Sequence, residues 1–168
     1  SDLKPAAKMT RTGRIGVLAT RGTLESDRFK GLVTTHAAGV DVLEQACPGL
    51  VERVEAGDVS SAETRRVVED YVAPLREAGV DVIVLGCTHF PFLEALIREA
   101  AGPGVSIVDP SEAVALQLVR RLHAENLRAD RDAGEETFLT TGDASQVAPV
   151  IAKVWGRPVP VESVRIDA

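Results

Sequence analysis

Three reactive side chains follow one another in the middle of the chain: the thiol of Cys87, the hydroxyl of Thr88 and the imidazole of His89. They come after an apolar, β-branched run over residues 80–85 that stops at Gly86, and a helical pattern follows them. The unpaired N–H groups and the dipole of a helix start favour negative charge. A cysteine there can be held partly as thiolate, the form that acts as base or nucleophile. Cys87 is therefore a candidate catalytic residue. His89 is a candidate proton shuttle or donor to a substrate carboxylate.

Each of these residues also has a structural interpretation. Free cysteine is often a small buried hydrophobe, and a histidine at this position could simply cap the helix. Cys47 also follows a predicted strand. It lacks polar neighbours, however, and Pro48 removes one backbone donor, so we interpret Cys47 as a packing residue.

Polar residues follow two further predicted strands. Thr20 and Thr23 come after the strand predicted at 14–20, and their hydroxyls could bind a small anion. The alternative is that Thr20 ends the strand and Thr23 caps the next helix. Residues 140–143, Thr-Thr-Gly-Asp, follow a later strand. Ligands of parallel α/β folds bind outside the carboxyl ends of the strands, so we expect these segments at that edge.

The elements that must position these residues alternate between strand and helix. Apolar runs predict strands at 14–20, 40–46, 81–85, 105–108, 137–140 and 160–164. Helical patterns occupy 23–32, 60–78, 91–101, 111–126 and 144–155, with Ser60 and Glu63 resembling a capping box and Gly79 a suitable stop. Residues 127–136 are predicted to be an exposed loop. This alternation predicts an α/β fold with a parallel sheet flanked by helices.

Composition narrows the function further. The chain has 168 residues, a net charge of −6 and two cysteines. The negative charge argues against a nucleic-acid surface, and no apolar run is long enough to cross a membrane. Two cysteines form neither a disulfide framework nor a zinc site, and they fit a reducing, cytoplasmic setting. Without a phosphate loop, a nucleophile elbow or a metal-ligand spacing, a mechanism without cofactor or metal remains.

Residues 85–93, Leu-Gly-Cys-Thr-His-Phe-Pro-Phe-Leu, resemble the second catalytic cysteine motif of the glutamate racemase family, in the aspartate/glutamate racemase superfamily. Weaker similarity extends over 13–20 with Thr23, 45–48 and 108–111. The resemblance implies cofactor-independent interconversion of L- and D-glutamate, which supplies D-glutamate for peptidoglycan, by a cytoplasmic homodimer.

In that family two cysteines face the α-carbon from opposite sides. The resemblance makes Cys87 the second of them, with Thr88 and His89 contacting substrate and His89 also tuning the thiol. It assigns substrate binding to Thr20 and Thr23 as well.

The sequence departs from the family pattern in one large respect. The Cys-Asn-Thr segment that holds the family's first cysteine, and an Asp-Ser-Gly segment near its N-terminus, do not occur here. The resemblance thus implies that residues 1–110 form the second, flavodoxin-like α/β domain, and that 111–168 belong to an incomplete first domain. We expect the chain alone to be inactive, and its uncovered apolar surface to promote self-association.

Two other functions fit the sequence. One is a racemase of the same superfamily that acts on aspartate or hydantoins. The other is a non-catalytic binding domain on a flavodoxin-like sheet, in which Cys87 would be buried and inert.

Overall fold

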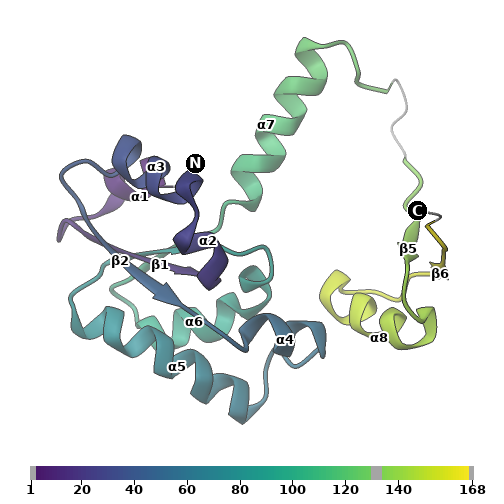
Figure 1. Cartoon of the computed structure of the whole chain (residues 1–168), viewed down its shortest axis with the longest axis horizontal. Coiled ribbons are helices and arrows are strands. Elements are labelled where there is room, and N and C mark those ends of the chain that lie inside the picture. Colours follow the sequence, from purple (N-terminus) through teal and green to yellow (C-terminus); the bar gives the residue numbers. More distant parts are fainter. Residues whose placement is uncertain (1–2, 130–133, 167–168) are drawn as a thin grey trace.

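The computed structural model describes residues 3–129 and 134–166, and it contains two separate parallel sheets. The larger sheet has the strand order β2-β1-β3-β4 (Figure 1). Its strands are β1 (Arg14–Ala19), β2 (Asp41–Ala46), β3 (Val82–Leu85) and β4 (Ser106–Val108). All of its pairings are parallel, which confirms the predicted fold class.

The two central strands, β1 and β3, are covered on both faces. Every residue of β3 is buried, as is every residue of β1 after Arg14. Near-continuous apolar runs are typical of such strands, because neither face meets water. Leu18 pairs with Leu85, so the segments after the two strands start level with each other.

Helices pack on each face of this sheet. They are α1 (Leu3–Met9), α2 (Arg21–Glu25), α3 (Asp27–His36), α4 (Leu50–Glu55), α5 (Ala62–Glu77), the 3₁₀ turn η1 (Phe90–Leu93) and α6 (Glu94–Ala101). One core cluster joins Leu18 and Ile83 to α4, α5, η1 and α6. The other joins Val17 and Val84 to α1, α2 and α3. Successive strand residues thus point into opposite cores.

Several element boundaries differ from the sequence-based expectation. Ser26 divides the helix expected at 23–32, because its hydroxyl accepts from the Phe29 N–H at 3.2 Å and starts α3. The N-cap of α5 is Ser61 and not Ser60, with its hydroxyl 3.1 Å from the Thr64 N–H. Helix α1 was not predicted, and α4 follows Cys47 at a place where the sequence allowed either a loop or a helix. Gly79 does follow the end of α5, with a φ of 77°.

The C-terminal segment contains α7 (Ser111–Ala124), β5 (Phe138–Thr140), α8 (Ala144–Trp155) and β6 (Val161–Ser163). Figure 1 shows α7 projecting away from the larger sheet and leading to the other three elements. β5 and β6 form a two-stranded parallel sheet, which fits an incomplete second α/β domain. The division at residues 110 and 111 stays a prediction. Across the described residues, no helix combines the length and apolarity that a membrane span requires.

Candidate active site

The predicted site residues lie where β1 and β3 end. β3 pairs with β1 although β2 lies between them in the sequence, so the chain runs to one side of β1 for β2 and to the other side for β3. Such a reversal is the topological switch point of a parallel sheet, and ligands of doubly wound folds bind in the crevice that it leaves. The sheet order therefore places the segments after Ala19 and Leu85 on the two sides of a natural binding crevice.

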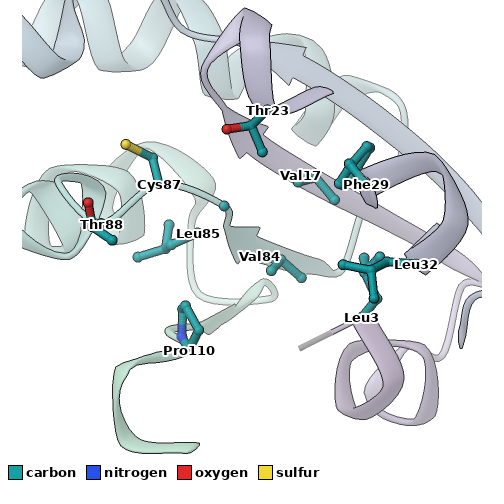
Figure 2. A pocket seen from close by; sticks show the side chains of 11 residues that line it. Leu3, Val17, Thr23, Phe29, Leu32, Val84, Leu85, Cys87, Thr88 and Pro110 are labelled. Carbon is teal, nitrogen blue, oxygen red and sulfur yellow. The ribbon is translucent and has the colours of Figure 1, made fainter. Parts of the chain in front are cut away.

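A pocket of about 220 Å³ occupies this crevice (Figure 2). Thr23 lines it after β1, and Gly86, Cys87 and Thr88 line it after β3. The rest of its lining is apolar: Leu3, Val17, Phe29, Leu32, Val84, Leu85 and Pro110. Cys87 is half-buried and opens onto the pocket, which is not the buried position that the non-catalytic alternative required. In Figure 2 the Thr23 hydroxyl points to the side on which Cys87 lies.

The two threonines after β1 act together. Thr20 is the N-cap of α2, and its hydroxyl oxygen lies 3.3 Å from the Thr23 N–H and 2.9 Å from the Thr23 hydroxyl oxygen. The expectation that Thr23 would cap the helix is wrong, because Thr20 already does so. Thr23 instead reaches the pocket, with Thr20 holding its side chain.

His89 connects the thiol to a carboxylate. Its Nδ1 lies 3.9 Å from the Cys87 Sγ and 3.5 Å from the Thr88 hydroxyl oxygen, while its Nε2 lies 2.6 Å from Glu55 Oε1. An ionised carboxylate can only accept, so Nε2 must donate, and in the neutral ring Nδ1 is left as an acceptor facing the thiol. His89 occupies the N-cap position before η1, but its side chain makes no capping hydrogen bond, so the alternative that the imidazole caps the helix is wrong. The result is a carboxylate–imidazole–thiol chain, an arrangement that can activate a sulfur.

Glu55 is the functional candidate that sequence reasoning missed. It ends the short helix α4, and it is brought to His89 from 34 positions away by tertiary packing. No local pattern distinguishes it from the other acidic residues. Its side chain is 66% exposed and that of His89 is 29% exposed, so water partly screens the pair.

Cys47, the other thiol, is only 1% exposed. Burial raises the pKa of Cys47 to about 12, so at neutral pH it stays protonated. Its Sγ lies 3.4 Å from the Gln45 carbonyl oxygen, a suitable acceptor. These observations confirm the interpretation of Cys47 as a packing residue.

The third polar segment does not join the site. Thr140 ends β5 of the smaller sheet, where its hydroxyl accepts from the Gly142 N–H at 3.0 Å. Asp143 caps α8 by accepting from the Ser145 N–H at 2.8 Å. Within residues 3–129 and 134–166, no three His, Cys, Asp or Glu side chains are grouped as a metal site would require.

The fold and the site together define a class: a parallel α/β protein with a pocket at its switch point and a contact chain of thiol, imidazole and carboxylate beside it. The chain belongs to the Asp/Glu/Hydantoin racemase family, whose model matches residues 3–118.

Within that family, the chain is similar to proteins named glutamate racemase. The chain is 48% identical over 149 residues to the glutamate racemase of Herpetosiphon aurantiacus, and 44% identical over 156 residues to that of Pseudomonas aeruginosa. These alignments cover 88% and 93% of the chain and 59% of each relative. The chain therefore spans about three fifths of the length of the curated relatives it matches.

Solved structures of glutamate racemases are also similar to this chain. A glutamate racemase isoform of Bacillus anthracis matches with a TM-score of 0.86 and 30% identity, over 98% of this chain and 62% of that one. The glutamate racemase of Escherichia coli, solved with L-glutamate and the activator UDP-MurNAc-Ala, matches with a TM-score of 0.82 and 27% identity, over 98% of this chain and 63% of that one.

Proposed function

We propose that this chain is part of a racemase that interconverts L- and D-glutamate, with Cys87 as one of its two acid–base groups. The observation that carries the proposal is the Cys87 thiol on the rim of the switch-point pocket, with His89 Nδ1 at 3.9 Å and Glu55 holding the far side of the ring. Relatives named glutamate racemase, at 44–48% identity, support glutamate as the substrate.

The stereochemistry of the reaction sets what the site must contain. Removing the α-hydrogen as a proton leaves a planar carbanion whose charge spreads into the carboxylate. Inversion follows only when a proton returns from the opposite face, so two acid–base groups must flank the carbon. Cys87 supplies one of them. Cys47 is unsuited to the other role, because it is buried and its pKa is about 12.

We therefore assign the second group to a cysteine on polypeptide that the relatives contain and this chain does not span. On that basis the chain alone is inactive. The same proposal places the enzyme in the cytoplasm as a homodimer that works without cofactor and supplies D-glutamate for peptidoglycan.

Cys87, His89 and Glu55 have different roles in the proposed proton transfers. His89 Nδ1 accepts the thiol proton, and Glu55 stabilises the imidazolium that results through its bond to Nε2. The thiolate then removes the α-proton of one enantiomer. In the reverse direction the Cys87 thiol donates its proton to the carbanion, and no net proton is lost.

Hydroxyl groups hold the substrate in this scheme. Thr23 and Thr88 reach the pocket from opposite sides of the crevice, where each can donate to a carboxylate or accept from the ammonium group. Thr20 contributes through its 2.9 Å contact with Thr23. His89 also binds the substrate carboxylate when it is protonated.

The test is exchange of the α-hydrogen of glutamate in D₂O, followed by NMR, together with racemisation followed by polarimetry. It compares the chain alone with a version extended at its N-terminus by the segment that the Herpetosiphon aurantiacus relative carries. The extended protein should racemise glutamate, and the chain alone should not. Cys87→Ala should abolish activity of the extended protein, whereas the matched control Cys47→Ala should keep it if folded. Activity that survives in Cys87→Ala removes the proposal.

The substrate is tested in the same extended protein. Glutamate should compete with labelled substrate far better than aspartate or hydantoins. If the protein prefers aspartate or a hydantoin, the proposed activity becomes racemisation of that substrate and not of glutamate.

Glu55→Gln tests the relay. The amide keeps the size of the side chain but can donate to Nε2 and so favour the wrong histidine tautomer. Racemisation by the extended protein should fall about tenfold, and Glu55→Gln should add little to His89→Asn, because the two act as one unit. Full additivity of the two losses would contradict the relay.

A further inference from the structure

Gly86 is the residue between β3 and Cys87, and its backbone lies unusually close to β1. Its N–H donates to the Leu18 carbonyl oxygen at 2.7 Å. A Cβ on this residue would lie 3.0 Å from the Ala19 Cβ, 3.0 Å from the Leu18 oxygen and 3.3 Å from a Val17 methyl carbon. All three distances are shorter than ordinary contact between carbon atoms or between carbon and a carbonyl oxygen.

The atoms that Gly86 approaches have little freedom to move. The Leu18 oxygen is backbone, the Ala19 Cβ is fixed to it, and both residues are buried in the central strand. Gly86 is not one of the glycines with a positive φ, so its backbone conformation is open to other residues. Space alone selects glycine here, as is typical where one backbone closely approaches another.

The two halves of the site begin at this point of contact. Cys87 directly follows Gly86, and Thr20, which holds Thr23, directly follows Ala19. Any side chain at position 86 would push the ends of β1 and β3 apart and move Cys87 away from Thr23. His89 would not follow freely, because Glu55 holds its ring and the next residue, Phe90, is fully buried.

We propose that Gly86 is a positioning residue that sets the spacing of the Cys87 thiol from Thr23 and from His89. The inference rests on the proposed function, because it assumes that the substrate binds between Cys87 and Thr23. The role is to bring a reactive group to the correct distance, where an error of about 1 Å is enough to slow a reaction severely.

Gly16 provides a matched control. It lies on β1 and pairs with Ile83, near the opposite end of the same two strands. A Cβ there would meet the Leu75 Cδ1 at 2.8 Å, so Gly16→Ala also strains the core, at a distance from the site. The obstructing contact is the end of a flexible leucine side chain, and no site residue is displaced.

The experiment measures the rate at which iodoacetamide alkylates Cys87 as pH is varied, with peptide mass spectrometry separating Cys87 from Cys47. It compares the parent chain, Gly86→Ala, Gly16→Ala and the double variant Ala19→Gly/Gly86→Ala. At neutral pH, Gly86→Ala should react about tenfold more slowly, because the sulfur moves away from His89 Nδ1, its proton acceptor. Gly16→Ala should lose stability but keep the parent alkylation profile. The double variant should recover part of the lost rate, since it removes the contact with the Ala19 Cβ but leaves the contact with the Leu18 oxygen.

The outcomes separate this proposal from the proposed function. A Gly86→Ala profile that matches the parent overturns the positioning role, whatever racemisation assays show. A slow Gly86→Ala partly restored by Ala19→Gly supports the role even if the extended protein fails to racemise glutamate, which would remove only the proposed function. If Gly86→Ala does not fold, as judged by circular dichroism, the double variant decides. Recovery of the fold with part of the parent reactivity supports the proposal, and failure to fold or to react overturns it.

Discussion

Both the region at residues 3–110 and the described residues after it, 111–129 and 134–166, contain apolar strand and helix patterns, but the two regions pack differently. Among the described residues, every buried one except Val159 lies at or before Ala101. Helix α5 buries its apolar stripe against the sheet, whereas α7 has no buried residue at all. Val114 is 64% exposed and Leu118 is 57% exposed, although they are spaced to share one face of α7. An amphipathic pattern thus predicts which face of a helix should be buried, but it does not predict which other element buries that face.

The strands repeat this difference. β1 and β3 are buried in a sheet of four strands, whereas β5 and β6 pair only with each other in the part of the chain that the structure describes. Parallel strands are normally covered on both faces, and a two-stranded sheet is marginal in water. Leu139 of β5 is 56% exposed. The second region therefore exposes apolar surface, which fits an incomplete α/β domain.

The largest expected effect sharpens this contrast with one substitution made in two helices. Leu75→Ala in α5 should lower the free energy of unfolding by about 2–5 kcal/mol, because it empties a packed site that is 3% exposed. Leu118→Ala in α7 should change it by less than about 0.5 kcal/mol, since little is buried there. Urea unfolding followed by circular dichroism measures both. A similar cost at both positions would show that α7 is covered in solution.

A smaller effect concerns two aspartates, one in each region. Burial pushes the pKa of Asp81 upward, but hydrogen bonds from the Thr10 and Thr12 hydroxyls and the Arg11 and Thr12 N–H groups outweigh it and lower the pKa to about 2. A lowered folded-state pKa stabilises the fold above the usual value of 3.8, and this contribution is lost as pH falls toward 2.

Asp81→Asn should therefore destabilise the fold by about 2 kcal/mol at neutral pH, and the difference from the parent should shrink as pH falls through that window. Asp143→Asn, at the exposed cap of α8, should have a weaker effect on global unfolding. Thermal melts across this pH range provide the measurement. An unchanged difference at acid pH would contradict the assignment to Asp81 ionisation.

Substitutions on the exposed face of α7 should have the smallest effect on folding. They should, however, clearly change how the chain self-associates. The chain should self-associate as its concentration rises, because Val114, Leu118 and their neighbours offer apolar surface. Val114→Lys/Leu118→Lys should reduce the mass measured by sedimentation while leaving unfolding of the first region unchanged. Lysines at two exposed polar positions of α7, Gln117 and His123, are the control. Equal association in both variants would move the interface away from α7.

Much of this fold could be predicted because its signals are local. The runs before Thr20 and Cys87 are apolar and β-branched, and both form buried strands where the sequence placed them. Helix α8 begins and ends at the predicted residues, with Asp143 at its cap. The errors in helix boundaries were also local. Ser26 and Ser61 are the N-caps of α3 and α5, and the backbone geometry that selects them is not evident from composition.

The site was predictable only where neighbours in sequence remain neighbours in space. Cys87, Thr88 and His89 are adjacent, so the sequence alone could suggest them as one group of candidate site residues. Glu55 reaches His89 only after α4 packs beside η1, and a lone glutamate gives no sign of that contact. The switch-point position depended on strand order, which periodicity does not determine.

The order of the strands also affects the chain while it is being made. The seam between β1 and β3 cannot close until β3 has left the ribosome, and β4, on the far side of β3, is made later still. Domains fold as units during synthesis, with the earlier parts emerging first. Until that seam closes, the sulfur of Cys87 has neither its imidazole acceptor in place nor the opposing hydroxyl of Thr23. The nascent polypeptide therefore exposes Cys87 without these partners, and the proposed reactive centre forms late, as a product of completed folding.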